Sequence, residues 1–481
     1  MKRGAFLFAL ITLLVFLAHA LYLRLPYFWD EMGQFVPAAL DIFRDGAWVP
    51  HSTVPNAHPP GVMAYLALVW TVFGYSIAAT RAAMLFLASL SVLVTFQLGR
   101  RLGPAWAVLP VVLLLLDPLF YIQAMLAQLD MPAMLLTLLV LLLFLDGRYK
   151  SAALASVALV MAKETGALLP LILGGALWLD RPARKQAWWY LAPFAALAVW
   201  FFVLWRNTGQ LFGDAGFTHY NLAYALHPVR AALSLIRRIY YLFIADFRWA
   251  GSIAIIWAWH RRKVYAARAW KIVWIFVAAH TLLVSLIGGA ELERYLLPVL
   301  PLVYIAMAAA WSACSARARI AGFAAVAAGL VLGLFINPVF PFPYENNLAM
   351  IDFVKLHQYA AQYLENAYPH QTIYTAWPLT QALRDPDFGY VRRKLDVAET
   401  SDLRESTLDQ IDPRKVQVLV LYSRTWEPEW GVLRWTPVRS FLSRFYEYGP
   451  QINAAQVRSH FGLVPVRRWT RGGLWAEVYA R

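Results

Sequence analysis

Two adjacent carboxylates, Asp30 and Glu31, follow an apolar N-terminal run and the aromatic stretch 27–29. Pro26 is expected to end the preceding helix, and aromatic side chains of this kind are typical of the headgroup level of a membrane. A carboxylate that is partly desolvated becomes a stronger base and can remove a proton from an acceptor. We therefore expect a reaction centre at the outer surface of a membrane; two solvated loop acids are the alternative.

Two further polar residues stand at the outer ends of apolar runs. His58 precedes a Pro-Pro turn, where an imidazole can donate a hydrogen bond to a phosphate. A plain turn is the alternative. Asp130 precedes a Met-Pro pair at the expected start of a helix, so stabilisation of the helix N-terminus is the alternative to a catalytic role.

Lys163 and Arg294 are candidate phosphate contacts. Lys163 and Glu164 separate two apolar runs that are each short for a span, and ionisable groups at membrane depth usually have a function. A self-paired hairpin turn is the alternative. Arg294 opens a helix, where a cation opposes the helix dipole and needs a partner. Glu291 or Glu293 is one possible partner, and a phosphate is the other.

The expected outer loop 206–237 carries the remaining candidates. Asp214 and His219 lie close in sequence, but two ligands alone are a poor case for a metal site. Arg237 begins the next helix and is a further candidate phosphate contact. The single cysteine, Cys314, excludes an intramolecular disulfide and Cys-rich metal sites. The sequence indicates no certain cofactor, and a divalent metal ion is an open alternative.

The composition indicates a multi-spanning membrane protein. The chain has 481 residues, of which 60% are hydrophobic and 15% charged, and its mean hydropathy is +0.51. The net charge of +15 does not indicate nucleic-acid binding, because the basic residues form short clusters between apolar runs, the pattern of cytoplasmic loops. No Gly-rich phosphate loop is present, which argues against ATP-driven work.

The first elements that position the acids are helices. The apolar run 4–23 is long enough for an uncleaved membrane span; a signal peptide cleaved after residues 18–20 is the alternative. The polar stretch 24–60 follows, and within it Phe35–Phe43 has the apolar spacing of an interfacial amphipathic helix.

Ten further spans are expected if every basic cluster is cytoplasmic. The run 61–74 is short and then suits a re-entrant or juxtamembrane helix. The topology has eleven spans, with the N-terminus inside and residues 338–481 outside; a twelfth span at 61–74 is the alternative. The basic clusters are Arg100/Arg101, Arg148/Lys150, Arg181/Arg184/Lys185, Arg261/Arg262/Lys263/Arg268/Lys271 and Arg317/Arg319. The ten spans are 80–98, 105–121, 130–146, 151–163, 166–179, 188–205, 238–259, 271–288, 295–312 and 319–337.

The composition changes after the last span. A Pro-rich linker, 337–343, leads into a polar and charged region with a helical pattern at 348–367. We therefore expect a transmembrane module, 1–337, and a small extracytoplasmic α/β domain, 338–481. Its expected strands are Thr372–Ala376, Val416–Tyr422 and Trp475–Tyr479.

As an ordered set, these motifs resemble those of the type-C polyprenyl-phosphate-sugar glycosyltransferases (GT-C), near the lipid A aminoarabinose transferases and protein O-mannosyltransferases. The resemblance covers residues 1–337 and is carried by an acidic pair after the first helix, a His-Pro-Pro turn, Asp-Met-Pro, a Lys-x-Thr-Gly turn and Arg-Tyr-Leu-Leu-Pro. It implies a polyprenyl-phosphate sugar donor, a lipid, glycan or protein acceptor, and inverting transfer at the outer face. Such transfer modifies lipopolysaccharide, other cell-envelope glycans or proteins.

The resemblance also implies roles for individual residues. Asp30 matches the family's catalytic aspartate, with Glu31 beside it, and Asp130 matches its second outer-face acid. His58 stands where the aminoarabinose transferases often carry lysine. Ala57 stands where they carry a glutamate linked to metal contact, and this departure argues both against aminoarabinose as the sugar and against a metal ion. The positions that match motifs near the donor phosphate are Lys163 and Arg294.

A mechanism of this kind needs few groups. The donor already has a good leaving group, so one base, Asp30, and several cations suffice: Lys163, Arg294, His58 and Arg237. A secondary transporter is an alternative class, but it predicts duplicated halves and charges at the midplane. A non-catalytic membrane assembly partner is a third. The Ala-, Leu- and Arg-rich composition indicates a bacterial inner (plasma) membrane.

Overall fold

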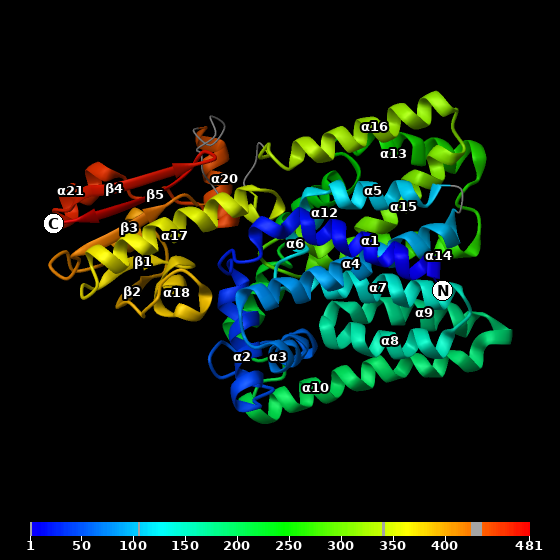
Figure 1. Ribbon diagram of the computed structural model, residues 1–481, viewed down its shortest axis with the longest axis horizontal. Helices are drawn as coiled ribbons and strands as arrows, with labels where there is room; N and C mark the ends of the chain where they lie inside the picture. Colours follow the sequence, from blue (N-terminus) through cyan, green and yellow to red (C-terminus); the bar gives the residue numbers. More distant parts are fainter. Residues whose placement is uncertain (1, 104–105, 339–341, 425–434) are drawn as a thin grey trace. The chain divides into compact units, whose positions relative to one another are not determined.

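The chain forms two compact units in a computed structural model that describes residues 2–103, 106–338, 342–424 and 435–481. The transmembrane unit comprises Met1–Leu23 and Phe35–Ile336, and the C-terminal unit comprises Arg24–Gln34 and Asn337–Arg481 (Figure 1). The acidic pair after the first helix therefore groups with the C-terminal unit, although it precedes most of the transmembrane unit in sequence. Part of the expected Pro-rich linker, 339–341, lies outside the described residues.

Within the described residues, five helical segments of the transmembrane unit are long and apolar enough to cross a membrane. This agrees with the predicted class, a mostly helical membrane protein. The segment Arg181–Thr208 combines a 3₁₀ stretch, η5 (Arg181–Leu191), with α10. The helices that form these segments are α1 (Lys2–His19, continued by η1, Ala20–Tyr22), α4 (Ile77–Leu102), α10 (Ala192–Thr208), α14 (Arg268–Leu286) and α16 (Ala316–Gly333).

Shorter apolar helices pack between the long ones. Helices α1, α4, α7, α8 and α10 contact one another in that order and form a row (Figure 1). Residues that are far apart in sequence therefore lie near one another at the ends of neighbouring helices in this row. The shorter apolar helices are α3 (Gly61–Phe73), α7 (Asp130–Leu145), α8 (Tyr149–Ala162), α9 (Leu168–Leu179) and α15 (Leu300–Ser312).

Three expected spans are wrong as continuous helices. The span 295–312 has a turn at 297–299, between η8 (Glu293–Leu296) and α15, and charged residues break the other two. The first residue of the span 105–121 lies outside the described residues. Within this span, α5 (Val108–Leu116) ends just before Asp117, whose side chain caps the next helix. The span 238–259 is broken between α12 (Pro228–Phe243) and α13 (Trp249–Trp257), where two residues have positive φ. In both cases a charged residue interrupts the apolar run and makes contacts that a continuous helix would prevent. The helix that follows Asp117 is α6 (Pro118–Gln123).

The charges at these breaks meet in a network that we call the Arg248 cluster (Asp117, Asp246, Arg248 and Tyr304), which is buried except for Asp246, whose side chain is 23% exposed. The guanidinium donates from Nη2 to Asp117 at 2.6 Å, from Nη1 to Asp246 at 2.8 Å and from Nε to the Tyr304 hydroxyl at 3.0 Å. Two carboxylates thus enclose one cation whose three nitrogens all donate, as a buried charge requires.

The amphipathic helix expected at Phe35–Phe43 is confirmed as α2 (Val36–Asp45). One face is buried, and Gly46 ends the helix in the left-handed region at φ 68°, which glycine adopts without strain. A π-helical turn, η2 (Glu31–Phe35), precedes it. The other short elements are η4 (Glu164–Ala167), α11 (Ala215–Thr218), η6 (His219–Tyr224), η7 (Ala258–Arg262) and η8 (Glu293–Leu296).

The C-terminal unit contains a five-stranded mixed sheet in the order β2-β1-β3-β5-β4. β1 pairs in parallel with β2 and β3, whereas β5 pairs antiparallel with β3 and β4. The three expected strands are present; β2 and β4 were not expected. The strands are β1 (Ile373–Ala376), β2 (Val397–Thr400), β3 (Val418–Tyr422), β4 (Val464–Arg471) and β5 (Leu474–Ala480).

The expected helix 348–367 is α17 (Ala349–Ala367), which packs against β4 and β5. The same unit holds the segment Arg24–Gln34. The Tyr27 N–H donates to the Phe388 carbonyl at 3.2 Å, and the Tyr390 hydroxyl donates to the Tyr27 carbonyl at 2.8 Å. These bonds fix the residues just before the acidic pair. The remaining elements are η9 (Tyr344–Asn346), α18 (Leu379–Arg384), η10 (Pro386–Phe388), α19 (Glu405–Leu408), α20 (Thr436–Tyr446) and α21 (Ala454–Phe461).

Candidate functional site

Asp130 does not cap the helix that it begins. It is the first residue of α7, whose N-terminus has no side-chain cap, and its own side chain is 3% exposed. One carboxylate oxygen accepts from Lys163 Nζ at 2.5 Å, and the other lies 3.2 Å from Arg294 Nε. Asp130 thus remains an acid in the first turn of α7 and is in addition a buried counter-ion for two cations.

Lys163 and Glu164 point to different partners. α8 ends at Ala162, and Lys163 then adopts an extended conformation, so that successive side chains leave the backbone in opposite directions. Lys163 contacts Asp130, whereas Glu164 accepts from His58 Nδ1 at 2.9 Å. The alternative of a self-paired hairpin turn is therefore wrong.

Arg294 has an ionic partner that is far from it in sequence. It lies in η8 with 4% of its side chain exposed, beside the Asp130 carboxylate. Glu293 is occupied by Arg237 Nε, which donates to it from α12. Glu293, one of the two sequence-local partners proposed for Arg294, thus forms an ion pair with a different arginine, Arg237.

Tyr295 provides an aromatic face for three of these cations. Lys163 Nζ lies 4.2 Å from the ring centroid, and the guanidinium carbons of Arg238 and Arg294 each lie 5.7 Å from it. Cations at such distances are attracted by the negative face of the ring. His280 of α14 holds the Tyr295 backbone, because its Nε2 lies 2.8 Å from the Tyr295 carbonyl oxygen.

Arg238 is the residue that the sequence analysis did not select. Its side chain is 2% exposed, and its Nη1 donates to the Leu292 carbonyl at 3.0 Å. Within the part of the chain that the structure describes, its buried Nε and Nη2 have no hydrogen-bond partner. An unpaired buried guanidinium N–H is costly, and such groups are normally satisfied by a protein group, water or a ligand.

The surrounding charges leave this region electropositive. We call it the cationic cluster, and its members are Lys163, Arg237, Arg238 and Arg294 with the paired acids Asp130 and Glu293. Burial raises the pKa of the Glu291 carboxyl, and Arg237 and Arg238 oppose that shift. Four cations therefore face two paired carboxylates and a third acid, Glu291.

His58 joins the edge of this region through its neighbours. Its ring pairs with Glu164, and α3 begins three residues later at Gly61. A Cβ at Gly61 would lie 2.4 Å from the Met161 carbonyl oxygen, so only glycine permits this approach of α3 to α8. The His58 turn is thus held against the chain segment that carries Lys163.

Asp30 and Glu31 differ in exposure and in contacts within the C-terminal unit. Glu31 is fully buried, and its Oε2 accepts from the Phe28 N–H at 2.8 Å. Asp30 is half-buried. The Glu31 carboxylate fixes the backbone of its own turn, which leaves Asp30 as the better candidate for chemistry at this position.

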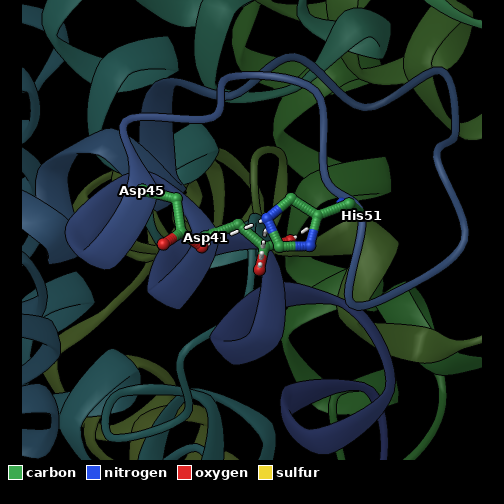
Figure 2. Close-up of side chains that lie close together, drawn as sticks. All are labelled: Asp41, Asp45 and His51. Carbon is green, nitrogen blue, oxygen red and sulfur yellow. Dashed lines mark hydrogen bonds and ion pairs between the residues drawn. The ribbon is translucent and has the colours of Figure 1, made fainter.

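The weak metal candidates are not brought together with a third ligand in the described ranges. Asp214 instead caps α11 by accepting from the Phe217 N–H at 2.8 Å, and His219 begins η6. A group of three possible ligands lies elsewhere in the transmembrane unit, at the end of α2 (Figure 2). It consists of Asp41, Asp45 and His51.

The cationic cluster is suited to an anion with several oxygen acceptors. Guanidinium groups match phosphate oxygens geometrically, and a lysine adds a point charge. Asp130 fixes the positions of Lys163 and Arg294 but does not neutralise the whole cluster. Preorganised cations of this kind stabilise negative charge that develops on a leaving group.

The fold resembles those of solved glycosyltransferase structures. ArnT from Cupriavidus metallidurans bound to undecaprenyl phosphate superposes with a TM-score of 0.59 at 15% identity, covering 99% of this chain and 98% of that one. Its apo structure gives 0.54 at 14% identity, with the same coverage. An oligosaccharyltransferase from Archaeoglobus fulgidus, tethered to an acceptor peptide, gives 0.50 at 11% identity, covering 88% of this chain and 69% of that one.

These neighbours confirm, at the level of the fold, the resemblance to GT-C enzymes that the motifs indicated. The likeness to ArnT extends over both units of the chain, beyond the 1–337 covered by the motifs. No protein-family model matches the sequence, and no curated protein matches it.

Proposed function

We propose that this protein is a membrane-embedded glycosyltransferase that uses a polyprenyl-phosphate-linked sugar as donor and a lipid, glycan or protein as acceptor. The observation that carries the proposal is the cationic cluster, in which the buried Arg238 retains donors that no described protein group accepts from. A phosphate is the anion that fits several fixed cations best. The fold shared with an ArnT bound to undecaprenyl phosphate supports the same ligand class.

In the proposed reaction, Asp30 is the general base. Its carboxylate takes the proton of the acceptor nucleophile, which attacks the anomeric carbon of the sugar. The bond from that carbon to the phosphate oxygen breaks, and its electron pair leaves with the polyprenyl phosphate. A single direct displacement inverts the configuration of the anomeric carbon, by analogy with inverting glycosidases.

The cationic cluster receives the departing phosphate in this mechanism. Lys163, Arg294 and Arg238 would contact its oxygens, with Arg237 and His58 at the edge. Because these cations are fixed before the reaction, they require little reorganisation when negative charge develops. Asp130 would act as their positioning counter-ion, since one of its carboxylate oxygens contacts Lys163 and the other contacts Arg294.

The proposed topology places this chemistry at the outer face of a bacterial inner membrane. It retains eleven spans, an internal N-terminus and an extracytoplasmic C-terminal unit. The supporting observation is the distribution of basic clusters in sequence. The C-terminal unit would then lie in the compartment that contains the acceptor.

The experiment that tests the base is the Asp30→Asn substitution in the purified full-length enzyme. General-base catalysis contributes roughly 10²–10⁴-fold, so we expect transfer to fall by that factor while expression and undecaprenyl-phosphate binding are unchanged. Asp214→Asn is the matched control, because asparagine also caps helices well and this acid has no proposed catalytic role. Transfer by Asp30→Asn at the wild-type rate would reject Asp30 as the base.

A further inference from the structure

The end of α2 brings three possible metal ligands together. Asp41 and Asp45 are four residues apart and therefore share one face of the helix. Gly46 then reverses the chain in the left-handed conformation, and the following loop returns His51 to the same face (Figure 2). One ligand atom from each of the three side chains lies within 4.8 Å of the others.

Asp41 is held in a fixed orientation for this purpose. Its side chain is 5% exposed, and its Oδ2 accepts from the backbone N–H groups of His51 and Ser52 at 2.9 and 3.0 Å. The other oxygen, Oδ1, faces His51 Nε2 at 3.6 Å, which is beyond hydrogen-bond distance. Backbone donors that fix one carboxylate oxygen and leave the other directed at a shared point are typical of ordered metal ligands.

The distances from the imidazole match a tetrahedral metal ion. His51 Nε2 lies 3.1 Å from Asp45 Oδ2 and 3.6 Å from Asp41 Oδ1. Zinc bonds to nitrogen and oxygen are roughly 2.0–2.2 Å long, so two ligands at a tetrahedral angle lie about 3.3–3.5 Å apart. The observed pair of distances spans this value. We propose that Asp41, Asp45 and His51 form a Zn²⁺ site whose remaining coordination position is open to solvent.

The ligand set favours zinc over the hard divalent cations. Mg²⁺ and Ca²⁺ take oxygen ligands, whereas an imidazole nitrogen with two carboxylates suits Zn²⁺ and its neighbours in the transition series. An ordinary ion pair of protonated His51 with the two acids is the competing explanation. Because His51 and Asp45 are 60% and 53% exposed, such a pair would contribute little to stability.

A metal here would link the last turn of α2 to the loop that leads towards His58. The connection from α2 to α3 spans residues 46–60, so the constraint would act on its first part, up to His51. This site is separate from the cationic cluster in its residues and does not depend on the proposed glycosyl transfer.

The test is metal binding by the full-length protein in detergent, purified through a tag without histidines and freed of metal. We expect one Zn²⁺ per chain by calorimetry, and a Co²⁺-substituted protein with the intense visible absorption of tetrahedral cobalt. His51→Ala and Asp45→Asn should each weaken zinc binding by about tenfold or more, since even loss of residues that only orient ligands costs 10–100-fold.

Two further variants separate a metal site from an ion pair. His51→Lys keeps the positive charge but cannot ligate zinc in the same position, so it should lose binding as His51→Ala does. His219→Ala removes an exposed histidine outside the cluster and should bind like the wild type. Wild-type protein without stoichiometric zinc binding, or His51 and Asp45 variants with wild-type affinity, would overturn the proposal.

Discussion

Two buried ionic clusters in the transmembrane unit satisfy their charges to different degrees. In the Arg248 cluster, one guanidinium donates from all three nitrogens, and two carboxylates and a tyrosine hydroxyl surround it. In the cationic cluster, four cations face two paired acids and Glu291, and the buried Arg238 donates one hydrogen bond within the described residues. The first arrangement is complete with protein groups alone, whereas the second has donors left for a ligand.

The degree to which protein groups satisfy a buried charge indicates whether that charge stabilises the fold or binds a ligand. A charge inside a protein is tolerated when partners satisfy it, so a complete network needs no further explanation. A network with surplus charge of one sign reduces stability unless another group arrives. Stability and ligand affinity should therefore respond in opposite ways when the two clusters are mutated.

The largest effect is expected from Asp117→Ala in the Arg248 cluster. Removing one partner of a buried ion pair leaves an uncompensated charge and typically costs about 3–5 kcal/mol. Unfolding in detergent, followed by circular dichroism, would measure the loss. The double variant Asp117→Leu/Arg248→Met removes both charges and should recover a large part of the stability. A single variant as stable as the wild type would show that this cluster is not a structural unit.

The comparison extends to the C-terminal unit, where the side chain of His357 is buried in its neutral form. His357 donates from Nδ1 to the Phe353 carbonyl at 2.9 Å and packs against Phe353 and Tyr422. Burial lowers the pKa of His357 to about 4, so the folded state binds fewer protons than the unfolded state below pH 6.5. The stabilisation is present above the unfolded pKa and is lost as pH falls towards 4.

We expect this histidine to reduce the stability of the C-terminal unit by about 2 kcal/mol between pH 7.5 and pH 5. Hydrogen exchange of the α17 and β3 amides, measured at both pH values, would report the change. His357→Phe cannot titrate and should remove this part of the pH dependence. The same pH dependence in His357→Phe would assign it to other groups.

The sharpest contrast is between Arg238→Leu and Arg248→Leu. Arg238→Leu removes a buried guanidinium with unpaired donors, so stability should be unchanged or higher. Affinity for undecaprenyl phosphate should fall by about 10–100-fold, the equivalent of one or two charged hydrogen bonds. Arg248→Leu should destabilise the protein, because it leaves Asp117 buried without its cation. Calorimetric binding and thermal unfolding would be measured on both variants.

Loss of stability in Arg238→Leu without loss of affinity would remove the distinction between the clusters. In that case Arg238 would serve the protein fold, and the assignment of the cationic cluster to phosphate binding would fail.

A smaller effect is expected from Arg294→Ala. Lys163 still compensates Asp130 in this variant, so the protein should remain folded. We expect the KM for the donor to rise by about tenfold, the equivalent of one interaction of about 1.4 kcal/mol, with little change in the KM for the acceptor. Steady-state kinetics with each substrate varied in turn would separate the two, and equal losses would argue against phosphate contact.

The sequence predicted the elements whose local pattern is strong. Long apolar runs predicted membrane helices, and Asp130, Lys163 and Arg294 were selected because charges at the ends of such runs are unusual. The structure brings these three side chains together. The sequence-local alternative for Lys163, a pair with Glu164, is wrong because each of these side chains takes its partner from another segment of the fold.

Other features depended on information that local patterns do not contain. Arg237 and Arg238 are adjacent, and only tertiary packing decides which points inward. The buried positions of α12 include Ser234, Arg238 and Tyr241, a spacing of four and three that marks one helix face and could have selected Arg238. The strand β4 is exposed along most of its length, so it lacks the alternating pattern that reveals strands.

Charged residues within the apolar runs are a sequence signal for the breaks in two expected spans, but hydrophobic periodicity alone does not detect it. Asp117, Asp246 and Arg248 interrupt apolar runs, and each charge needed a partner from another segment. The sequence shows these charges but does not show that they contact one another. The contacts form only when α6, α13 and α15 pack around Arg248.

The contact between Gly61 and the Met161 carbonyl makes the spacing of two chain segments depend on a single hydrogen atom. Any methyl group at position 61 would act as a wedge between α3 and α8, because 2.4 Å is far below van der Waals contact. His58 stands three residues before this point on one side, and Lys163 stands two residues after it on the other. The close approach of Gly61 to Met161 therefore determines the positions of the His58 turn and the Lys163 turn relative to each other. An uncharged substitution such as Gly61→Ala would displace both turns.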